Sequence, residues 1–233
     1  MFKENINKLI NRDVIANGAK RNVAISKYKT MKLKVCGMRD ARNITELIKL
    51  QPDFMGFIFH KKSPRNVSEI SNVDFPKTIK KVGVFVDKEE LFIREKVLDY
   101  GLDVIQLHGN ETPKECQQLK MKEFEIIKAF QISEDFDFEK LSDYEPFCNY
   151  FLFDAFGKDA GGNGITFNWN LLQKYNGQTP FLLSGGLDGT MTESILNISH
   201  DKFAGIDINS GFEIAPALKD IEKIKKFKQS LQR

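Results

Sequence analysis

Leu33-Lys34-Val35-Cys36-Gly37 is a short apolar run that ends directly at a glycine, which is typical of a buried strand leading into a turn. Seven further runs of this kind follow it, at residues 54–59, 81–86, 104–108, 125–131, 150–155, 181–184 and 204–209. They are rich in Val, Ile and Phe, as parallel strands buried on both faces should be. We therefore predict eight strands.

The spacing of the eight runs indicates how they are connected. Successive runs end 22 to 31 residues apart, and segments with helical periodicity lie between them. Eight strands at this spacing, each followed by a helix, predict an α/β fold, a single (β/α)8 TIM barrel over residues 31–233. A doubly wound open sheet is the alternative, although it rarely needs eight units of such even length. No linker rich in Pro, Gly or Ser divides the region, so we expect one domain.

Two of the intervening helices have clear sequence signals. The stretch Asp87-Lys88-Glu89-Glu90 resembles a capping box at the start of one helix. The last helix is predicted to have one apolar stripe with lysines elsewhere, made of Leu218, Ile221, Ile224, Phe227 and Leu231.

The composition, with 41% hydrophobic and 29% charged residues in 233, is that of an ordinary globular protein with a sizeable core. No apolar stretch approaches the ~18 residues that cross a bilayer, and the N-terminus lacks a secretory signal, so we expect no membrane contact. Three widely spaced cysteines argue against a disulfide framework and favour the reducing cytoplasm. With three histidines and no Cys-x-x-Cys, we expect no metal site.

The net charge of +3 is unevenly spread along the chain. Residues 1–30 hold seven Lys or Arg and two acids, a balance of +5, so the remainder carries −2. A slightly acidic body does not favour nucleic-acid binding. We predict that residues 1–30 are a basic N-terminal extension, a solvated and disordered tail before a domain that begins near Met31. A tether to an acidic partner is the alternative for this extension.

Alternation along the strands separates polar from apolar side chains, because positions i and i+2 share one face. One face carries Lys34 and Cys36, Gln106 and His108, Leu182 and Ser184, and Asp207 and Asn209. The other face is apolar and suits packing under helices, with Leu33, Val35, Ile105, Leu107, Ile206 and Ile208. We expect the polar set to point into the barrel mouth, where barrel enzymes keep their chemistry.

Cys36 is the first candidate for that chemistry, because it lies at a strand end beside a glycine. A thiolate is a competent base when a nearby cation lowers the pKa of the thiol, and Lys34 on the same face is expected to do so. The alternative is a small buried hydrophobic residue, which is common for free cysteine. That alternative describes Cys116 and Cys148 well.

Asp154 is the second candidate, at the end of the run Tyr150-Phe151-Leu152-Phe153. Apolar surroundings raise the pKa of a carboxyl group, so Asp154 is predicted to hold a proton and act as a general acid. A helix cap or an ion-pair partner is the alternative.

Two glycine-rich turns follow the seventh and eighth strands, Ser184-Gly185-Gly186 and Asn209-Ser210-Gly211. Barrels often bind phosphate at this place through backbone N–H groups, so Gly185, Gly186, Asn209, Ser210 and Gly211 are predicted to hold one. A third glycine-rich stretch, residues 161–164, lacks the features of a nucleotide-binding motif and is predicted to close over a ligand.

Four more residues are predicted to contact the substrate. Arg65 follows the second strand, and its guanidinium group suits a substrate carboxylate, although a solvated arginine is the alternative. Gln106, His108 and Asp207 are expected to line the pocket. His108 has the alternative of a hydrogen bond with Gln106 alone.

Taken in order, nine motifs resemble those of the phosphoribosylanthranilate isomerases, barrel enzymes of tryptophan biosynthesis. They are Lys34-Val35-Cys36-Gly37, Gly56-Phe57-Ile58-Phe59, Ser63-Pro64-Arg65, Val82-Gly83-Val84-Phe85-Val86, Gln106-Leu107-His108-Gly109, Leu152-Phe153-Asp154, Gly161-Gly162-Asn163-Gly164, Leu183-Ser184-Gly185-Gly186-Leu187 and Asp207-Ile208-Asn209-Ser210-Gly211-Phe212-Glu213. The resemblance covers the chain from Met31 to its end.

The resemblance implies an Amadori rearrangement of N-(5-phosphoribosyl)anthranilate to 1-(2-carboxyphenylamino)-1-deoxyribulose 5-phosphate, without cofactor or metal. It implies that Asp154 protonates the ring oxygen of this small phosphorylated substrate and that Cys36 removes the C2 proton. It further implies that Arg65 holds the anthranilate carboxylate and that the two glycine turns hold the phosphate. For the oligomeric state, a monomer and a homodimer are the two alternatives.

Two positions depart from the family pattern, since many relatives carry lysine where Ile165 stands and glycine where Ala217 stands. The sibling isomerase of histidine biosynthesis is one alternative. It is expected to have aspartate in place of Cys36 and a two-fold repeat, and neither is visible here. A non-catalytic barrel that binds a phosphorylated ligand is another alternative, although it has no reason to keep both Cys36 and Asp154.

Overall fold

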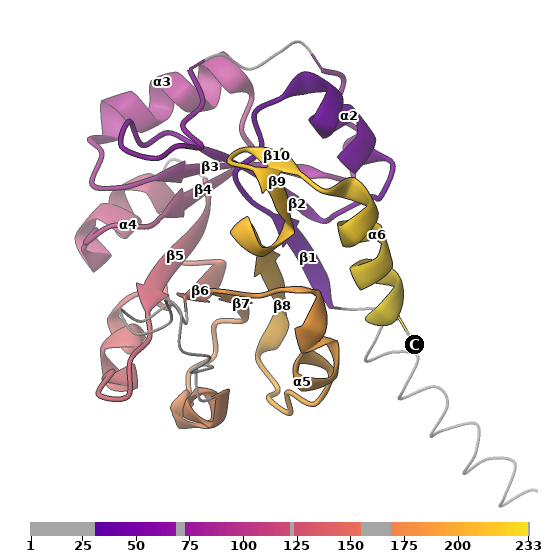
Figure 1. Cartoon of the computed structure of the whole chain (residues 1–233). Coiled ribbons are helices and arrows are strands. Elements are labelled where there is room, and N and C mark those ends of the chain that lie inside the picture. Colours follow the sequence, from indigo (N-terminus) through magenta and orange to yellow (C-terminus); the bar gives the residue numbers. More distant parts are fainter. Residues whose placement is uncertain (1–30, 69–72, 122–123, 155–168, 233) are drawn as a thin grey trace, which may run out of the picture.

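Eight parallel strands close into a barrel in which each strand pairs with its neighbours in sequence and β8 returns to β1 (Figure 1). The structure is a computed structural model, and it describes residues 31–68, 73–121, 124–154 and 169–232. Residues 1–30, the stretch 161–164 and Ile165 lie outside the described residues, so the predictions for them stay predictions. The predicted barrel is confirmed.

Every predicted strand is present, with ends within one residue of those expected. The strands are β1 (Lys32–Val35), β2 (Phe54–Ile58), β3 (Lys80–Phe85), β4 (Val104–Leu107), β5 (Glu125–Gln131), β6 (Tyr150–Asp154), β7 (Phe181–Ser184) and β8 (Phe203–Ile208). A short antiparallel hairpin, β9 (Glu213–Ala215) and β10 (Leu218–Lys219), follows β8.

Helices surround this barrel (Figure 1). The α-helices are α2 (Ala41–Ile48), α3 (Glu90–Tyr100), α4 (Pro113–Lys120), α5 (Thr192–Leu196) and α6 (Ile221–Ser230). The 3₁₀ helices are η1 (Phe138–Asp143), η2 (Trp169–Lys174), η3 (Gly189–Met191) and η4 (Ser210–Phe212). No helix of the described part is long and apolar enough to cross a membrane.

The prediction of a helix after every strand is wrong for the connection that follows β2. Its described residues, 59–68 and 73–79, form no helix. Pro64 interrupts helical hydrogen bonding there, and Asn66 returns to the sheet through a bridge to Ile58. This return places Arg65 over the end of the barrel.

The predicted capping box before α3 is also wrong. Glu89 is the residue that precedes the helix, and its side chain makes no capping hydrogen bond. The carboxylate of Asp87 instead accepts the backbone N–H of Asn110 at 2.6 Å, which ties the β3 end to the β4 end. A full capping box occurs at α4, between Thr112 and Glu115.

The predicted stripe of the last helix is confirmed in part. Ile224 and Phe227 of α6 and Leu231 just beyond it are buried. Leu218 lies instead in β10, where it is exposed. The helix begins later because Asp220 caps it by accepting the N–H of Lys223.

Alternation along the strands gives the barrel the predicted apolar layer under the helices and a second apolar layer inside the barrel, which was not predicted. The layer under the helices includes Leu33, Val35, Ile105, Leu107, Ile206 and Ile208. The layer inside the barrel consists of Phe54, Val82, Val104, Ile127, Ala129, Leu152 and Leu182. The inner layer is capped toward the strand ends by polar side chains, and these form the candidate site.

Candidate active site

Cys36 lies immediately after β1, and its N–H donates to the carbonyl of Ile208 on β8 at 2.9 Å. Its thiol packs against Gly56 of β2, where a Cβ atom would lie 2.7 Å from Sγ. Gly56 therefore makes the room that the thiol occupies. Cys36 is 5% exposed, so the thiol is nearly sealed from solvent.

A buried ion pair lies directly below this thiol inside the barrel. Nζ of Lys34 is 2.9 Å from Oδ2 of Asp207, and the two side chains are 0% and 5% exposed. The pair forms because Lys34 on β1 and Asp207 on β8 are direct partners in the strand register. The Lys34 ammonium group also interacts with the thiol of Cys36.

The electrostatic balance at Cys36 differs from the predicted one. Burial raises the pKa of the Cys36 thiol above its ordinary value, while the positive charges of Lys34 and Lys219 oppose that rise. Lys34 therefore acts in the predicted direction, but the prediction of a lowered pKa is wrong. The reason is that desolvation of the thiolate outweighs the nearby charges.

Asp154 is joined to His108 and Gln106 in a chain of contacts. Oδ2 of Asp154 is 3.3 Å from Nε2 of His108, and Nδ1 of His108 is 2.8 Å from Nε2 of Gln106. Gln106 and Asp207 are both buried polar residues. Burial raises the pKa of the Asp207 carboxyl group, while the charges of Lys34 and, to a lesser extent, His108 oppose this rise. The expected hydrogen bond between His108 and Gln106 is present.

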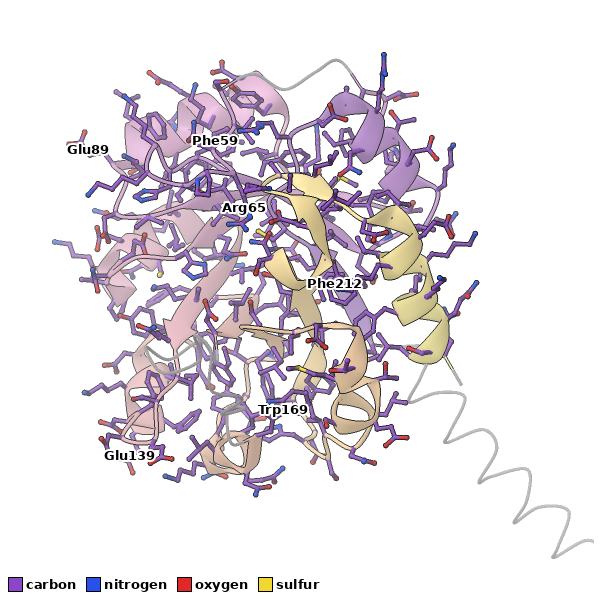
Figure 2. All side chains as sticks on the ribbon, in the orientation of Figure 1. Phe59, Arg65, Glu89, Glu139, Trp169 and Phe212 are labelled. Atoms are coloured by element: carbon purple, nitrogen blue, oxygen red, sulfur yellow. The ribbon has the colours of Figure 1, made fainter. Side chains whose placement is uncertain are left out.

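Arg65 is anchored by Glu213 of the β9–β10 hairpin, and Figure 2 shows it beside that hairpin. Its Nε lies 2.9 Å from Oε1 of Glu213, and its Nη2 lies 2.6 Å from Oε2. Nζ of Lys219 lies 2.6 Å from Oε1 of Glu213 and 2.6 Å from Oδ1 of Asn209. Arg65 is therefore held in place, which excludes a freely solvated arginine.

The carboxylate of Glu213 is the centre of this cluster. Burial by itself raises its pKa, but hydrogen bonds from Arg65 and Lys219 prevail and lower the pKa to about 2. Glu213 and Lys219 were not predicted to be site residues. Glu213 ends the last of the nine motifs, which was a signal that could have identified it, whereas Lys219 has no signal beyond a positive charge six positions after Glu213.

Gly37 brings this cluster next to Cys36. Its φ of 77° lies in the left-handed region that favours glycine. A Cβ atom there would lie 2.8 Å from Cδ of Arg65 and 2.8 Å from Oδ1 of Asn209. A larger residue at position 37 would therefore displace both side chains.

The two glycine turns and two carboxylates line one cavity of about 200 Å³. Its lining consists of Asp154, Ser184, Gly185, Gly186, Leu187, Asp207, Asn209, Ser210 and Gly211. Oδ1 of Asp207 is buried and finds no hydrogen-bond partner among the described residues. The wall of this cavity therefore combines both predicted phosphate-binding turns with two carboxylates.

A second cavity of about 540 Å³ adjoins the first at Asp154, which lines both. His108, Lys128, Phe130 and Tyr144 also line it. Among the described residues that line these two cavities, Cys36 and Arg65 are absent. Cys36 reaches the first cavity indirectly, through Lys34 to Asp207. Within the described part, no group of three His, Cys, Asp or Glu residues could hold a metal ion.

Comparison with known proteins gives one consistent result. The family model described as N-(5'-phosphoribosyl)anthranilate (PRA) isomerase matches residues 33–230. A protein of Parabacteroides distasonis named N-(5'-phosphoribosyl)anthranilate isomerase is 47% identical over 206 residues, which cover 86% of this chain and 93% of the relative. A protein of the same name from Phocaeicola vulgatus is 46% identical, covering 87% of this chain and 98% of the relative.

Solved structures agree with these relatives. The crystal structure of phosphoribosyl anthranilate isomerase from Thermotoga maritima has a TM-score of 0.75 and 29% identity, covering 87% of this chain and 98% of that one. Another structure of such an enzyme, in complex with reduced 1-(o-carboxyphenylamino)-1-deoxyribulose 5-phosphate, has a TM-score of 0.72 and 27% identity with the same coverage.

Proposed function

This chain belongs to the N-(5'-phosphoribosyl)anthranilate isomerase family of tryptophan biosynthesis, and we propose that Asp154 and Cys36 carry out its acid–base chemistry. The reaction is the Amadori rearrangement of N-(5-phosphoribosyl)anthranilate to 1-(2-carboxyphenylamino)-1-deoxyribulose 5-phosphate. The observation that carries the site assignment is that Asp154, Asp207 and both glycine turns line a single cavity.

Asp154 acts in the first step as the general acid. It donates a proton to the ring oxygen, the furanose opens, and the nitrogen lone pair forms the C1=N bond of a Schiff base. The position of Asp154 between the two cavities supports this role, because a proton donor must reach the substrate from the cavity wall.

Cys36 acts in the second step as the general base. Its thiolate takes the proton from C2, the electron pair of that C–H bond forms the C1=C2 bond of an enolamine, and the π electron pair of the C1=N bond returns to the nitrogen. The enolamine then tautomerises to the ketone. The thiolate must form against the cost of burial, and the ammonium groups of Lys34 and Lys219 are the charges that favour it. Both steps use side chains alone.

Three contacts orient the substrate in this proposal. The phosphate binds the backbone at the turns Gly185-Gly186 and Ser210-Gly211 beside Asn209, and Oδ1 of Asp207 accepts a sugar hydroxyl. Arg65 binds the anthranilate carboxylate. Nε and Nη2 of Arg65 already donate to Glu213, whereas Nη1 makes no hydrogen bond to the described residues. The substrate carboxylate therefore binds at the edge of the guanidinium group that carries Nη1.

The test is to mix purified protein with phosphoribosylanthranilate and to follow the loss of its fluorescence. We expect turnover by the native chain and a loss of at least about 10²-fold in kcat for Asp154→Ala, the scale of a positioned acid. Tight binding of a product analogue without turnover by the native chain would instead identify a non-catalytic, phosphate-binding barrel.

We assign residues 1–30 to a basic extension and residues 31–233 to the catalytic barrel. We also place the protein in the cytoplasm, where its three free cysteines would stay reduced. Deleting residues 1–30 and comparing turnover and salt-dependent association tests the extension.

One Thermotoga maritima relative is described as dimeric, so sedimentation should decide between a monomer and a homodimer here.

A further inference from the structure

Two of the three cysteines contact each other on the outer side of the barrel, away from Cys36. Cys116 belongs to α4 and is 0% exposed, and Cys148 lies two residues before β6 and is 8% exposed. The Cys148 thiol donates a hydrogen bond to the sulfur of Cys116. Their interpretation as small buried hydrophobic residues accounts for the burial but not for this contact between the two sulfurs.

The two segments that carry these thiols are joined on both sides of the pair. Ahead of both thiols in the sequence, Oη of Tyr144 donates to the carbonyl of Glu111 at 3.3 Å. After both thiols, Nζ of Lys120 lies 3.0 Å from Oδ1 of Asn149. The fold therefore holds the two sulfurs together, and a bond between them needs no rearrangement of these segments.

The surroundings of the pair favour a thiolate at Cys116. The hydrogen bond from Cys148 lowers the pKa of the Cys116 thiol below its ordinary value, while burial opposes this shift and the positive charge of Lys128 supports it. The Lys128 side chain is 3% exposed, and its Nζ lies 3.2 Å from Oε2 of Glu111, whose negative charge acts against the thiolate. The thiolate is the form of cysteine that reacts with oxidants.

The third thiol, that of Cys36, has the opposite balance. Burial raises the pKa of the Cys36 thiol, so a smaller fraction of it is thiolate at neutral pH than of the Cys116 thiol. Cys36 also lies beside Gly56 and Ile208, and the other two cysteines are in contact with each other. An oxidant that attacks thiolates is therefore expected to react with the pair before it reacts with Cys36.

We propose that Cys116 and Cys148 form a redox site, a dithiol that a hydroperoxide converts into an intramolecular disulfide while Cys36 stays reduced. The oxidant approaches from the side of Cys148, the more exposed of the two. In a reducing cytoplasm such a disulfide is transient, because cellular dithiols reduce it again. The inference goes beyond the proposed function and does not depend on it.

The reaction has two steps. The thiolate of the pair attacks the O–O bond, an S–O bond forms and the O–O bond breaks, and the leaving oxygen departs as water or an alcohol with the proton of the other thiol. The second thiolate then attacks the sulfenic sulfur, the S–S bond forms and the S–O bond breaks, and hydroxide leaves and is protonated by solvent. The two thiols lose two electrons, and the hydroperoxide gains them.

The test treats the reduced, full-length protein with one equivalent of hydrogen peroxide and maps disulfides by mass spectrometry of unreduced peptides. We expect a mass lower by two hydrogen atoms and one linked peptide pair that contains Cys116 and Cys148. Iodoacetamide added after unfolding in urea should then modify Cys36 alone, and dithiothreitol should restore all three thiols.

Three variants identify the partners. Cys116→Ser and Cys148→Ser should form no intramolecular disulfide, since each lacks one sulfur of the pair. Cys36→Ala is the matched control and should form the disulfide as readily as the native chain.

The inference would be overturned by three free thiols after peroxide treatment, by a disulfide that includes Cys36, or by oxidation of Cys36 as fast as that of the pair. A serine variant that fails to fold leaves the test decisive, because the peptide map of the native chain identifies the linkage by itself. None of these measurements uses turnover. If Cys36→Ala or Asp154→Ala retains turnover, the proposed function of that residue fails while the dithiol result stands.

Discussion

Lys34 and Asp207 lie 173 positions apart in sequence, yet their charged groups are 2.9 Å apart inside the barrel, and both side chains are buried. This contact connects the two halves of the candidate site. Lys34 faces the thiol of Cys36, while Asp207 lines the cavity that Asp154 and the glycine turns share. A buried ion pair of this kind is a weak source of stability, because desolvation offsets the attraction, so its position beside Cys36 points to a role in the chemistry.

Replacing Cys36 by alanine should lower kcat by at least about 10²-fold, because the C2 proton then has no base. The measurement is the fluorescence assay with phosphoribosylanthranilate, together with binding of a phosphate analogue, which should persist. Cys148→Ala is the matched control, since Cys148 is also a buried free thiol but lies outside the site. Equal turnover in the two variants would remove Cys36 from the mechanism.

Replacing Lys34 by methionine should raise the pKa of the Cys36 thiol further, because a charge that favours the thiolate is lost. A thiol acts as a base only when deprotonated, so the activity of the variant should recover toward higher pH than in the native chain. Alkylation of Cys36 by iodoacetamide, followed by mass spectrometry across pH, reads the same shift without turnover. A pH dependence that matches the native chain would show that Lys34 does not act on the thiol.

The same substitution leaves Asp207 as an unpaired buried charge. We expect the free energy of unfolding to fall by about 3–5 kcal/mol, the usual cost of removing one partner of a buried pair. Urea unfolding measures this. The double variant Lys34→Met with Asp207→Asn should recover part of the loss, and no recovery would mean that packing, rather than charge, explains the effect.

Replacing Arg65 by alanine should mainly weaken substrates that carry the ortho carboxylate. We expect kcat/KM to fall by about 10²-fold for phosphoribosylanthranilate, as for loss of a charge-assisted pair, and little for an analogue without the carboxylate. Arg94 of α3, whose exposed guanidinium group lies 3.8 Å from Oε1 of Glu90, gives a control through Arg94→Ala. An equal loss for both substrates would contradict the assigned role.

Replacing Ala217 by glycine should stabilise the protein. Ala217 has a φ of 66°, a left-handed conformation that costs a residue with a Cβ about 1–2 kcal/mol. Glycine avoids this cost but loses more entropy on folding, so we expect a net gain of about 0.5–1 kcal/mol in urea unfolding. Ala215→Gly in the same hairpin is the control and should destabilise, since Ala215 lies in β9 without a positive φ.

Local pattern was sufficient to predict the strands and the face on which each side chain lies. Val35 packs under the helices and Lys34 points inward because alternation is a property of any strand, whatever its neighbours. The glycine turns after β7 and β8 were recognisable for the same local reason. Predictions were wrong where a side chain has its partner far away in the sequence. The carboxylate of Asp87, for example, accepts the backbone N–H of Asn110 and does not cap the helix that follows Asp87.

The sequence by itself determined eight strands, their two-faced pattern, the barrel and the family, because each of these depends on residues close together in the chain. Only the tertiary structure decided which charges meet. Glu213 and Lys219 became part of the site when β8 closed against β1, and the same closure buried Cys36 and reversed the expected direction of its pKa shift. Desolvation and pairing depend on distances through space, which no local pattern encodes.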